Sequence, residues 1–324
     1  MNYQSPSLHL ENQTELIALC PICTSSSVRC LYNDLSDYLL GHTGNFVLSR
    51  CTECKHEFLS KRPTEAAIEK YYTGNYYTHK PANLAKANTK TCFNSITNGA
   101  AKLWNMITLR SIENLKALPN QVVLDYGCGN GRTLYQMQKN GWIVKGFEPD
   151  VAAMNSANQL LGHGSVTNAS DSVLRSDSYD IIILSHVIEH VHSPLQLLLK
   201  LKETLREDGT LVITTPLAGC LESQLFGKYW RGYECPRHIH VFSEYSLQKL
   251  SRQAGLDIIM VRPEMLPMCT VESIQISLQN KMNIKLPYLF LRLTYLIVYP
   301  ISLGLMHLGI SSSMKILLRL KKYS

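Results

Sequence analysis

The sequence has 324 residues, enough for one full domain with smaller additions. Hydrophobic residues make up 45% and charged residues 18% of it, a composition that excludes disordered and fibrous chains. The net charge is +7, and residues 281–324 hold seven Lys or Arg and no acidic residue, so the excess positive charge lies in this C-terminal segment. A nucleic-acid-binding enzyme more often spreads positive charge over the face that meets phosphate. We therefore do not expect nucleic acid as a partner.

The N-terminus lacks the basic stretch followed by an apolar run that is typical of a secretory signal. We therefore expect a cytoplasmic protein whose ten cysteines are reduced thiols. Four of these cysteines form two Cys-x-x-Cys pairs, Cys20 with Cys23 and Cys51 with Cys54, with 27 residues between the pairs. Four thiolates complete a closed tetrahedral zinc site that leaves no position for a reactive water. A redox role is the alternative, but redox motifs do not usually come as two flanking pairs. The spacing predicts a structural zinc ribbon over residues 18–60.

Residues 64–118 are expected to be mostly helical and to act as a lid or linker, with Thr64 as the first helix cap. Aromatic residues of this segment, together with one later tryptophan, are secondary candidates for an acceptor pocket, although such clusters more often pack a core. They are Tyr71, Tyr72, Tyr76, Tyr77 and Trp230.

Residues 120–263 alternate apolar strand patterns with amphipathic helices. The clearest strands are 122–125, 142–148, 180–184 and 210–214, and weaker candidates lie at 165–167 and 256–261. Apolar runs of this kind are expected where helices cover both faces of a parallel sheet. The pattern predicts a doubly wound α/β domain of the Rossmann-like class.

A glycine-rich loop, Asp125 to Gly131, follows the first of these strands. In a doubly wound sheet this turn opens a ligand crevice, and glycines let the backbone approach a ligand closely. The nicotinamide fingerprint would place its third glycine at position 132, but that residue is Arg132, which disfavours a nicotinamide oxidoreductase. Glu148 ends the second strand, where a carboxylate can accept hydrogen bonds from both ribose hydroxyls of an adenosine.

The loop and the strand-end glutamate together resemble class I S-adenosylmethionine-dependent methyltransferases. Residues 178–191 resemble that family's fourth strand and the loop after it, and the most similar group is the ubiquinone-biosynthesis O-methyltransferases. The resemblance covers residues 120–263 and implies S-adenosylmethionine as the cofactor. Asn168 stands where the family often has an acidic residue that contacts adenine. The cofactor contacts that the resemblance implies are Asp125, Gly127, Gly129, Gly131, Glu148, Asn168, Ala169 and Ser185.

Methyl transfer from a sulfonium mainly requires that donor and acceptor be positioned in line. An oxygen or carbon acceptor must also lose a proton, and a histidine suits that task near neutral pH. Four histidines lie in suitable loops, His186, His190, His238 and His240. His238 lies in a segment that resembles the family's P-x-H…F-S element, so we favour it over His190, which follows the fourth strand. Organising these loops is the alternative role for either histidine.

We therefore predict an active methyltransferase that acts on a small or lipid-linked acceptor. Quinone precursors, lipid-linked sugars and polysaccharide intermediates all fit an apolar, basic tail, and the sequence does not choose among them. The alternative is a non-catalytic zinc-ribbon adaptor that retains a cofactor-type fold. The intact loop glycines and Glu148 favour the enzyme.

Residues 264–324 form an apolar and basic C-terminal extension. Arg292 and Pro300 interrupt its apolar part, which is marginal in length for a membrane-spanning helix. The last dozen residues, drawn as a helix, place basic and apolar side chains on different faces: Lys315, Arg319 and Lys322 against Met314, Leu317 and Leu318. This pattern predicts an interfacial helix on an anionic membrane, with burial against the core as the alternative.

Overall fold

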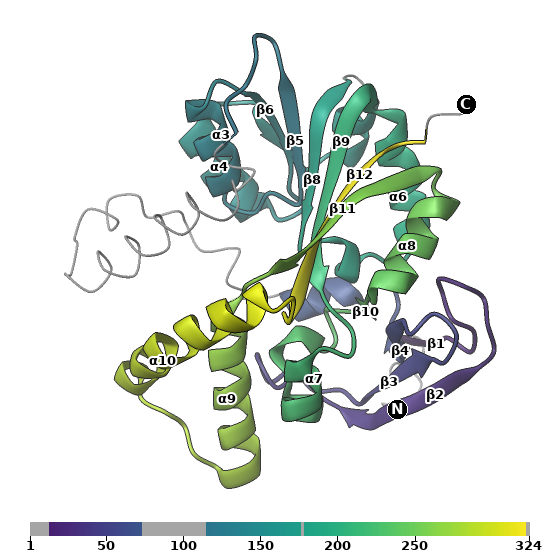
Figure 1. Ribbon diagram of the computed structural model, residues 1–324, viewed down its shortest axis with the longest axis vertical. Coiled ribbons are helices and arrows are strands. Elements are labelled where there is room, and N and C mark those ends of the chain that lie inside the picture. Colours follow the sequence, from purple (N-terminus) through teal and green to yellow (C-terminus); the bar gives the residue numbers. More distant parts are fainter. Residues whose placement is uncertain (1–12, 73–114, 176–177, 322–324) are drawn as a thin grey trace, which may run out of the picture. The chain divides into compact units, whose positions relative to one another are not determined.

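The computed structural model describes residues 13–72, 115–175 and 178–321 (Figure 1). Contacts between Cα atoms divide the chain into two compact units. The first unit comprises residues 1–74, 186–202 and 212–324, and the second comprises residues 75–185 and 203–211.

The second unit is built around parallel strands in the order β8-β5-β6-β7. These strands are β5 (Val122–Tyr126), β6 (Ile143–Phe147), β7 (Val166–Thr167) and β8 (Tyr179–Ser185). The helices between them are α3 (Arg132–Lys139), α4 (Val151–Leu161) and α5 (Ser170–Arg175). The interiors of β5 and β8 are buried apolar runs, as expected for strands covered by helices.

The register of this sheet aligns the carboxyl ends of three strands. Tyr126 at the end of β5 pairs with Phe147 at the end of β6, and Phe147 pairs with Thr167 at the end of β7. The residues that follow each strand therefore start from one edge of the sheet. This edge is where open α/β sheets bind their ligands.

The first unit contains an antiparallel sheet in the order β1-β4-β3-β2. Its strands are β1 (Thr14–Leu16), β2 (Val28–Leu35), β3 (Phe46–Cys51) and β4 (Glu57–Pro63). A short later strand, β10 (His240–Val241), also pairs with β4, so residues far along the chain complete the N-terminal sheet. Side chains from both segments share one apolar cluster, which includes Phe46, Leu59, Tyr71, Trp230 and Val241.

Helices and further strands make up the rest of the described first unit. They are η1 (Ile68–Tyr72), η5 (Ile188–His190), α6 (Pro194–Glu203), α7 (Leu221–Phe226), η6 (Gly227–Tyr229), η7 (Arg231–Tyr233), α8 (Glu244–Gln253), β11 (Leu256–Glu264), α9 (Pro267–Met282), α10 (Tyr288–His307) and β12 (Ser313–Leu320). The division between the units falls within β9 (Leu205–Pro216). The larger sheet has the strand order β11-β12-β9-β8-β5-β6-β7, which confirms a Rossmann-like α/β fold.

The C-terminal segment is a strand and not the helix that its charge pattern predicts. β12 pairs antiparallel with β11, and Met314, Ile316 and Leu318 are buried on one side of it. The alternation of these apolar residues has the period of a strand, and pairing with β11 supplies the backbone hydrogen bonds. Lys315 forms an ion pair of 2.9 Å with Glu264 of β11. Lys322 lies outside the described residues.

In the described part of residues 64–118, a turn at 65–67 leads into the 3₁₀ helix η1, and residues 115–118 are in neither helix nor strand. Tyr71 of this helix and Trp230 are buried in the apolar cluster of the first unit, so these two candidates pack a core and do not line an open acceptor pocket. Tyr76 and Tyr77 lie outside the described residues, as does most of the expected helical lid.

If residues 313–320 form a strand in the sheet, Leu318 and Leu317 should differ in their contribution to stability, whereas an interfacial helix implies no such difference. Leu318→Ala should lower the free energy of unfolding by about 2–5 kcal/mol, because it leaves a cavity in a buried site. The matched change Leu317→Ala, at a half-buried position of the same strand, should cost clearly less. Denaturant unfolding followed by circular dichroism measures both, and equal losses would contradict the strand.

Candidate active site and metal centre

The glycine loop after β5 folds back on the end of β6. Gly127, Gly129 and Gly131 have φ angles of 86°, 54° and 75°, which lie in the left-handed region that favours glycine. The amides of Gly127 and Cys128 both donate to the carbonyl of Phe147, over 2.8 and 3.0 Å. A Cβ at Gly131 would lie 2.9 Å from the Cβ of Ala157 in α4. The loop therefore needs its glycines both for backbone conformation and for close packing.

Glu148 is fixed at this loop by hydrogen bonds. Glu148 is only 7% exposed, and its Oε2 accepts a hydrogen bond of 2.7 Å from the amide of Gly129. Its Oε1 accepts another, of 3.0 Å, from the amide of Asp150, which caps the N-terminus of α4. A buried carboxylate beside a glycine loop fits the ribose hydroxyls of an adenosine ligand.

The other predicted cofactor residues of the second unit lie at the ends of its strands. Asp125 is buried in the last part of β5, and Ser185 is the exposed last residue of β8. Asn168 and Ala169 are exposed and directly follow β7, where Thr167 Oγ1 accepts a hydrogen bond of 3.1 Å from the Ala169 amide. Since the strands are parallel and in register, these positions and Glu148 belong to the same edge of the sheet.

The four cysteines of the two pairs lie together in the first unit. Their sulfur atoms are all within 4.8 Å of one another, and the Cys20–Cys54 and Cys23–Cys51 sulfur distances are both 3.5 Å. The two pairs form similar knuckles, in which the amides of Thr24 and Lys55 donate back to the carbonyls of Cys20 and Cys51. This thiol set fits a tetrahedral zinc ion with four cysteine ligands.

The cysteine knuckles are attached to a later part of the same unit. Ser243 Oγ donates to the carbonyl of Cys54 over 2.8 Å, and Gln253 Nε2 donates to the carbonyl of Ile22 over 3.1 Å. His240 Nδ1 lies 3.0 Å from Nε2 of His56, and burial holds the pKa of His240 well below its usual value. His240 therefore helps to join the module to this segment, and its buried position makes it a poor candidate for a base.

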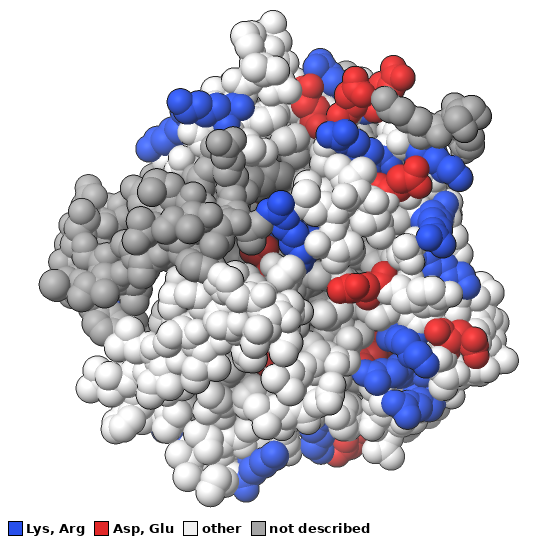
Figure 2. Space-filling model, viewed as in Figure 1, with Lys and Arg blue, Asp and Glu red and all other residues white. Residues whose placement is uncertain are grey.

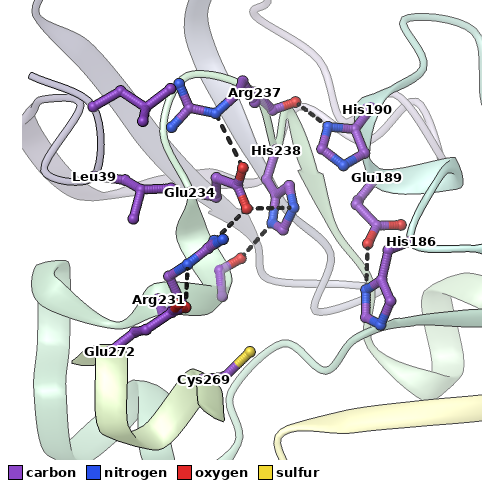
Figure 3. A network of polar contacts seen from close by, with 12 residues as sticks. Leu39, His186, Glu189, His190, Arg231, Glu234, Arg237, His238, Cys269 and Glu272 are labelled. Atoms are coloured by element: carbon purple, nitrogen blue, oxygen red, sulfur yellow. Dashed lines mark hydrogen bonds and ion pairs between the residues drawn. The ribbon is translucent and has the colours of Figure 1, made fainter. Parts of the chain in front are cut away.

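His238 and His190 come together in a buried polar network of the first unit (Figure 3). His238 Nδ1 donates to the carbonyl of Gly232 over 2.7 Å, which leaves the lone pair on Nε2. His190 Nδ1 lies 3.1 Å from the carbonyl of Arg237 and 2.9 Å from the hydroxyl of Tyr72. The two rings meet edge to face, with centroids 4.6 Å apart.

Both imidazoles are expected to be neutral at pH 7. Burial lowers the pKa of His238 to about 4, although Glu234 opposes this shift. Burial also lowers the pKa of His190, against the opposing charges of Glu189 and Glu234. His190 is partly exposed, whereas His238 is buried and its Nε2 lies 3.5 Å from Glu234. His190 is thus the better placed of the two to meet a substrate.

His186, the remaining histidine candidate, is paired with a carboxylate. Its Nδ1 lies 3.0 Å from Oε1 of Glu189, whose Oε2 accepts a hydrogen bond of 3.1 Å from Thr215. Burial opposes ionisation of Glu189, but His186 holds the pKa of this carboxyl below its usual value. Burial opposes protonation of His186, and the same pairing raises its pKa. The pairing with Glu189 therefore favours the protonated imidazole of His186 more than in a free histidine.

The charged residues that hold this network are not among those that the sequence pattern predicts. Arg237 is fully buried and donates to both carboxylate oxygens of Asp37, over 2.7 and 2.9 Å, and to Glu234 over 3.0 Å. Burial opposes ionisation of Glu234, but Arg231 holds the pKa of its carboxyl well below the usual range. Arg237 directly precedes the candidate His238, and this position could have indicated a role near the histidines. Its pairing with Asp37, 200 residues away, has no local signal.

A family model described as a methyltransferase domain matches residues 100–261, half of the chain. The chain belongs to this family. It is an S-adenosylmethionine-dependent methyltransferase, so the predicted enzyme class and cofactor are confirmed, and the adaptor and the nicotinamide oxidoreductase are not supported.

Curated relatives of this methyltransferase act on different acceptors, according to their names. A tRNA U34 carboxymethyltransferase of Vibrio atlanticus is 26% identical over 164 residues, 48% of this chain and 50% of the relative. A ubiquinone biosynthesis O-methyltransferase of Haemophilus ducreyi is 29% identical over 104 residues, 29% of this chain and 44% of the relative. The chain thus spans half or less of the length of these relatives.

Solved structures of methyltransferases are also similar to this chain. One is the O-methyltransferase of a trans-AT PKS multienzyme from Brevibacillus brevis in complex with S-adenosyl-L-homocysteine. The match has 17% identity and a TM-score of 0.42, and it covers 72% of this chain and 80% of that one.

Glu148→Ala should weaken binding of S-adenosylhomocysteine by about 1–3 kcal/mol, because the ligand's polar groups and the Gly129 amide lose their acceptor. Calorimetric titration measures this change. Glu207→Ala, an exposed glutamate in the same unit, serves as the control and should leave the affinity unchanged. Equal affinities for the Glu148 variant and the wild type would remove Glu148 from the cofactor site.

Cys51→Ser should remove zinc from the protein, because three thiolates no longer complete the tetrahedral shell. Cys30→Ser changes an exposed thiol of the neighbouring strand β2 and should leave about one zinc per chain. Elemental analysis of protein purified without added metal compares the two. Stoichiometric zinc in the Cys51 variant would exclude Cys51 as a ligand.

Proposed function

We propose that the enzyme moves a methyl group from S-adenosylmethionine to an oxygen or carbon of a small or lipid-linked acceptor, and that His190 accepts the proton that the acceptor loses. The observation that carries this proposal is the pair of neutral imidazoles whose Nδ1 atoms face backbone carbonyls. An imidazole held in this way presents an Nε2 lone pair, which is the form that a general base requires.

S-adenosylmethionine, when bound, supplies an electrophilic methyl group on a positively charged sulfur. Transfer of this group to the acceptor would break its bond to sulfur and release a neutral thioether. The acceptor's proton passes to Nε2 of His190, which becomes an imidazolium. The nearby carboxylates of Glu189 and Glu234 favour that charge. His238, packed edge to face on His190, is proposed as the residue that positions it.

For the acceptor, we favour an apolar molecule over nucleic acid. The relatives include enzymes named for tRNA and for ubiquinone biosynthesis, so both kinds are represented. The basic residues in excess all lie in residues 281–324, beside a strongly apolar helix, and this combination suits a lipid-linked sugar or quinone precursor. A peripheral position at the cytoplasmic face of a membrane would bring such an acceptor to the enzyme.

The acceptor class is tested by methyl transfer from radiolabelled S-adenosylmethionine. The purified enzyme is incubated in parallel with a total lipid extract, with a water-soluble metabolite fraction and with unmodified tRNA. Label in the lipid or the metabolite fraction supports the proposal. Label in tRNA alone would overturn it and assign the enzyme to nucleic acid.

His190→Asn should lower the rate of methyl transfer by about 10²–10⁴-fold, because the acceptor loses its general base. The affinity for S-adenosylhomocysteine should stay unchanged. His163→Asn, which alters an exposed histidine, is the control and should leave the rate unaffected.

The pH profile provides a separate check on this base. The active form is the neutral imidazole, which persists above the pKa, and burial lowers that pKa. The acidic limb of kcat/KM should therefore lie below about pH 6.5, the usual value for histidine. A full rate in the His190 variant, or an acidic limb above pH 6.5, would exclude this role.

A further inference from the structure

Helix α10 is apolar on its exposed face as well as on its buried one. Val298 and Met306 are buried by the protein. The side turned away from the protein carries Leu289, Phe290, Leu293, Ile297 and Ile301, which are 48–64% exposed. These residues recur at intervals of three or four and form one stripe along the helix. A surface helix of a soluble domain has polar residues in such a stripe, and a helix that is apolar all round is normally covered.

The exposed apolar surface continues around the hairpin that α9 and α10 form. Met282, Ile284 and Tyr288 lie at or near the connection between the two helices and are 43–73% exposed. Figure 2 shows a broad area without charged residues over these two helices, at the lower left of the view. We call this surface the hairpin patch, which consists of the exposed apolar residues of 282–301. It is a contiguous area of the kind that marks an interaction site.

The charges around the hairpin patch have one sign. No Asp or Glu follows Glu272 in the sequence, whereas Lys281, Lys285 and Arg292 lie within or beside the patch. Lys281 and Lys285 are exposed near the connection between the helices. The guanidinium of Arg292 lies over the ring of Tyr288, 5.3 Å from the ring centre, so this charge is held beside an exposed aromatic residue of the patch. Long basic side chains beside apolar residues are typical of a helix at a lipid interface.

α10 is long and apolar enough to cross a membrane, but its packing argues against a span. Val298 and Met306 of the helix are buried by protein and α10 contacts α9, so lipid cannot surround the helix along its whole length. The segments before and after it are also tied to the same unit. Ser273 of α9 accepts a hydrogen bond of 2.9 Å from the amide of Arg231, and β12 pairs with β11. The helix therefore offers one face to a partner.

We propose that the hairpin patch docks on an anionic lipid bilayer, with α10 lying in the plane of the interface. The apolar stripe enters the boundary between head groups and acyl chains, and the three basic side chains meet anionic head groups. This inference deepens the proposed location at a membrane and replaces the C-terminal basic residues as the contact. Lys315 of that segment is paired with Glu264 in the sheet.

A second copy of the chain is the other possible occupant of an apolar face. In a twofold dimer the same patch would face itself. Lys281, Lys285 and Arg292 of both copies would then meet without an acidic residue of the hairpin patch to offset them, which disfavours association. An anionic bilayer supplies the missing negative charge.

Binding of the full-length protein to vesicles tests the proposal. Vesicles of phosphatidylglycerol and phosphatidylcholine are sedimented with the wild type and with the triple variant Leu289→Ser, Leu293→Ser and Ile297→Ser. The variant should lose at least about tenfold in partitioning, because its apolar stripe is gone. The control is Leu16→Ser, Leu19→Ser and Leu118→Ser, which removes three exposed leucines elsewhere and should bind as the wild type does.

Charge variants separate the hairpin from the C-terminal strand. Lys281→Gln, Lys285→Gln and Arg292→Gln together should reduce the preference for phosphatidylglycerol over pure phosphatidylcholine, whereas Lys315→Gln with Arg319→Gln should not. Loss of binding only in the second pair would return the contact to the C-terminal segment and overturn the proposal.

Two further measurements make the outcome specific. Melting temperature and S-adenosylhomocysteine affinity of the hairpin variants should match the wild type, which shows that lost binding is not lost folding. Sedimentation velocity identifies a dimer. A dimer that the leucine variant dissociates, with no vesicle binding by the wild type, would assign the patch to a second copy. Methyl transfer to a dissolved acceptor is scored separately, so failure of docking does not depend on the proposed reaction.

Discussion

The first unit depends on one fully buried guanidinium. Arg237 has no exposed surface, and a charge in that position is tolerated only when it is fully paired. Asp37, from the N-terminal segment, and Glu234, from the same loop, supply the pairing. The carbonyl of Arg237 also faces His190, and its neighbour in the sequence is His238. The ion pair thus links the cysteine module to the histidines proposed to act in catalysis.

The same link would give a zinc ion bound by the four cysteines a structural purpose. The cysteine knuckles hold β3 and β4, β4 pairs with β10, and β10 begins two residues after His238. A zinc ion with four thiolate ligands has no open position for substrate, so an ion bound here would contribute by folding this segment. Loss of the metal would therefore disturb the positions of the histidines through backbone pairing and packing, although no zinc ligand would contact the substrate.

The second unit brings together the predicted cofactor contacts, which lie on separate strands. Parallel pairing in register makes β5, β6 and β7 end together, so the glycine loop, Glu148 and Asn168 start from one edge. The left-handed conformation of its glycines then lets the loop bring the Gly129 amide to the carboxylate of Glu148. The hairpin of α9 and α10 is inserted in the chain between β11 and β12, which pair with each other in the larger sheet.

Local patterns in the sequence determined the parallel strands, the glycine loop, Glu148 and the cysteine pairs, because each depends on residues close together in the chain or on strand order. Tertiary structure decided the rest. The last segment has both a helical charge pattern and a strand alternation, and only pairing with β11 selects the strand for Met314 and Leu318. The partner of Arg237 lies 200 residues away, so no local pattern could identify Asp37. The exposure of α10 was equally undecided, because an apolar sequence is the same whether protein or lipid covers it.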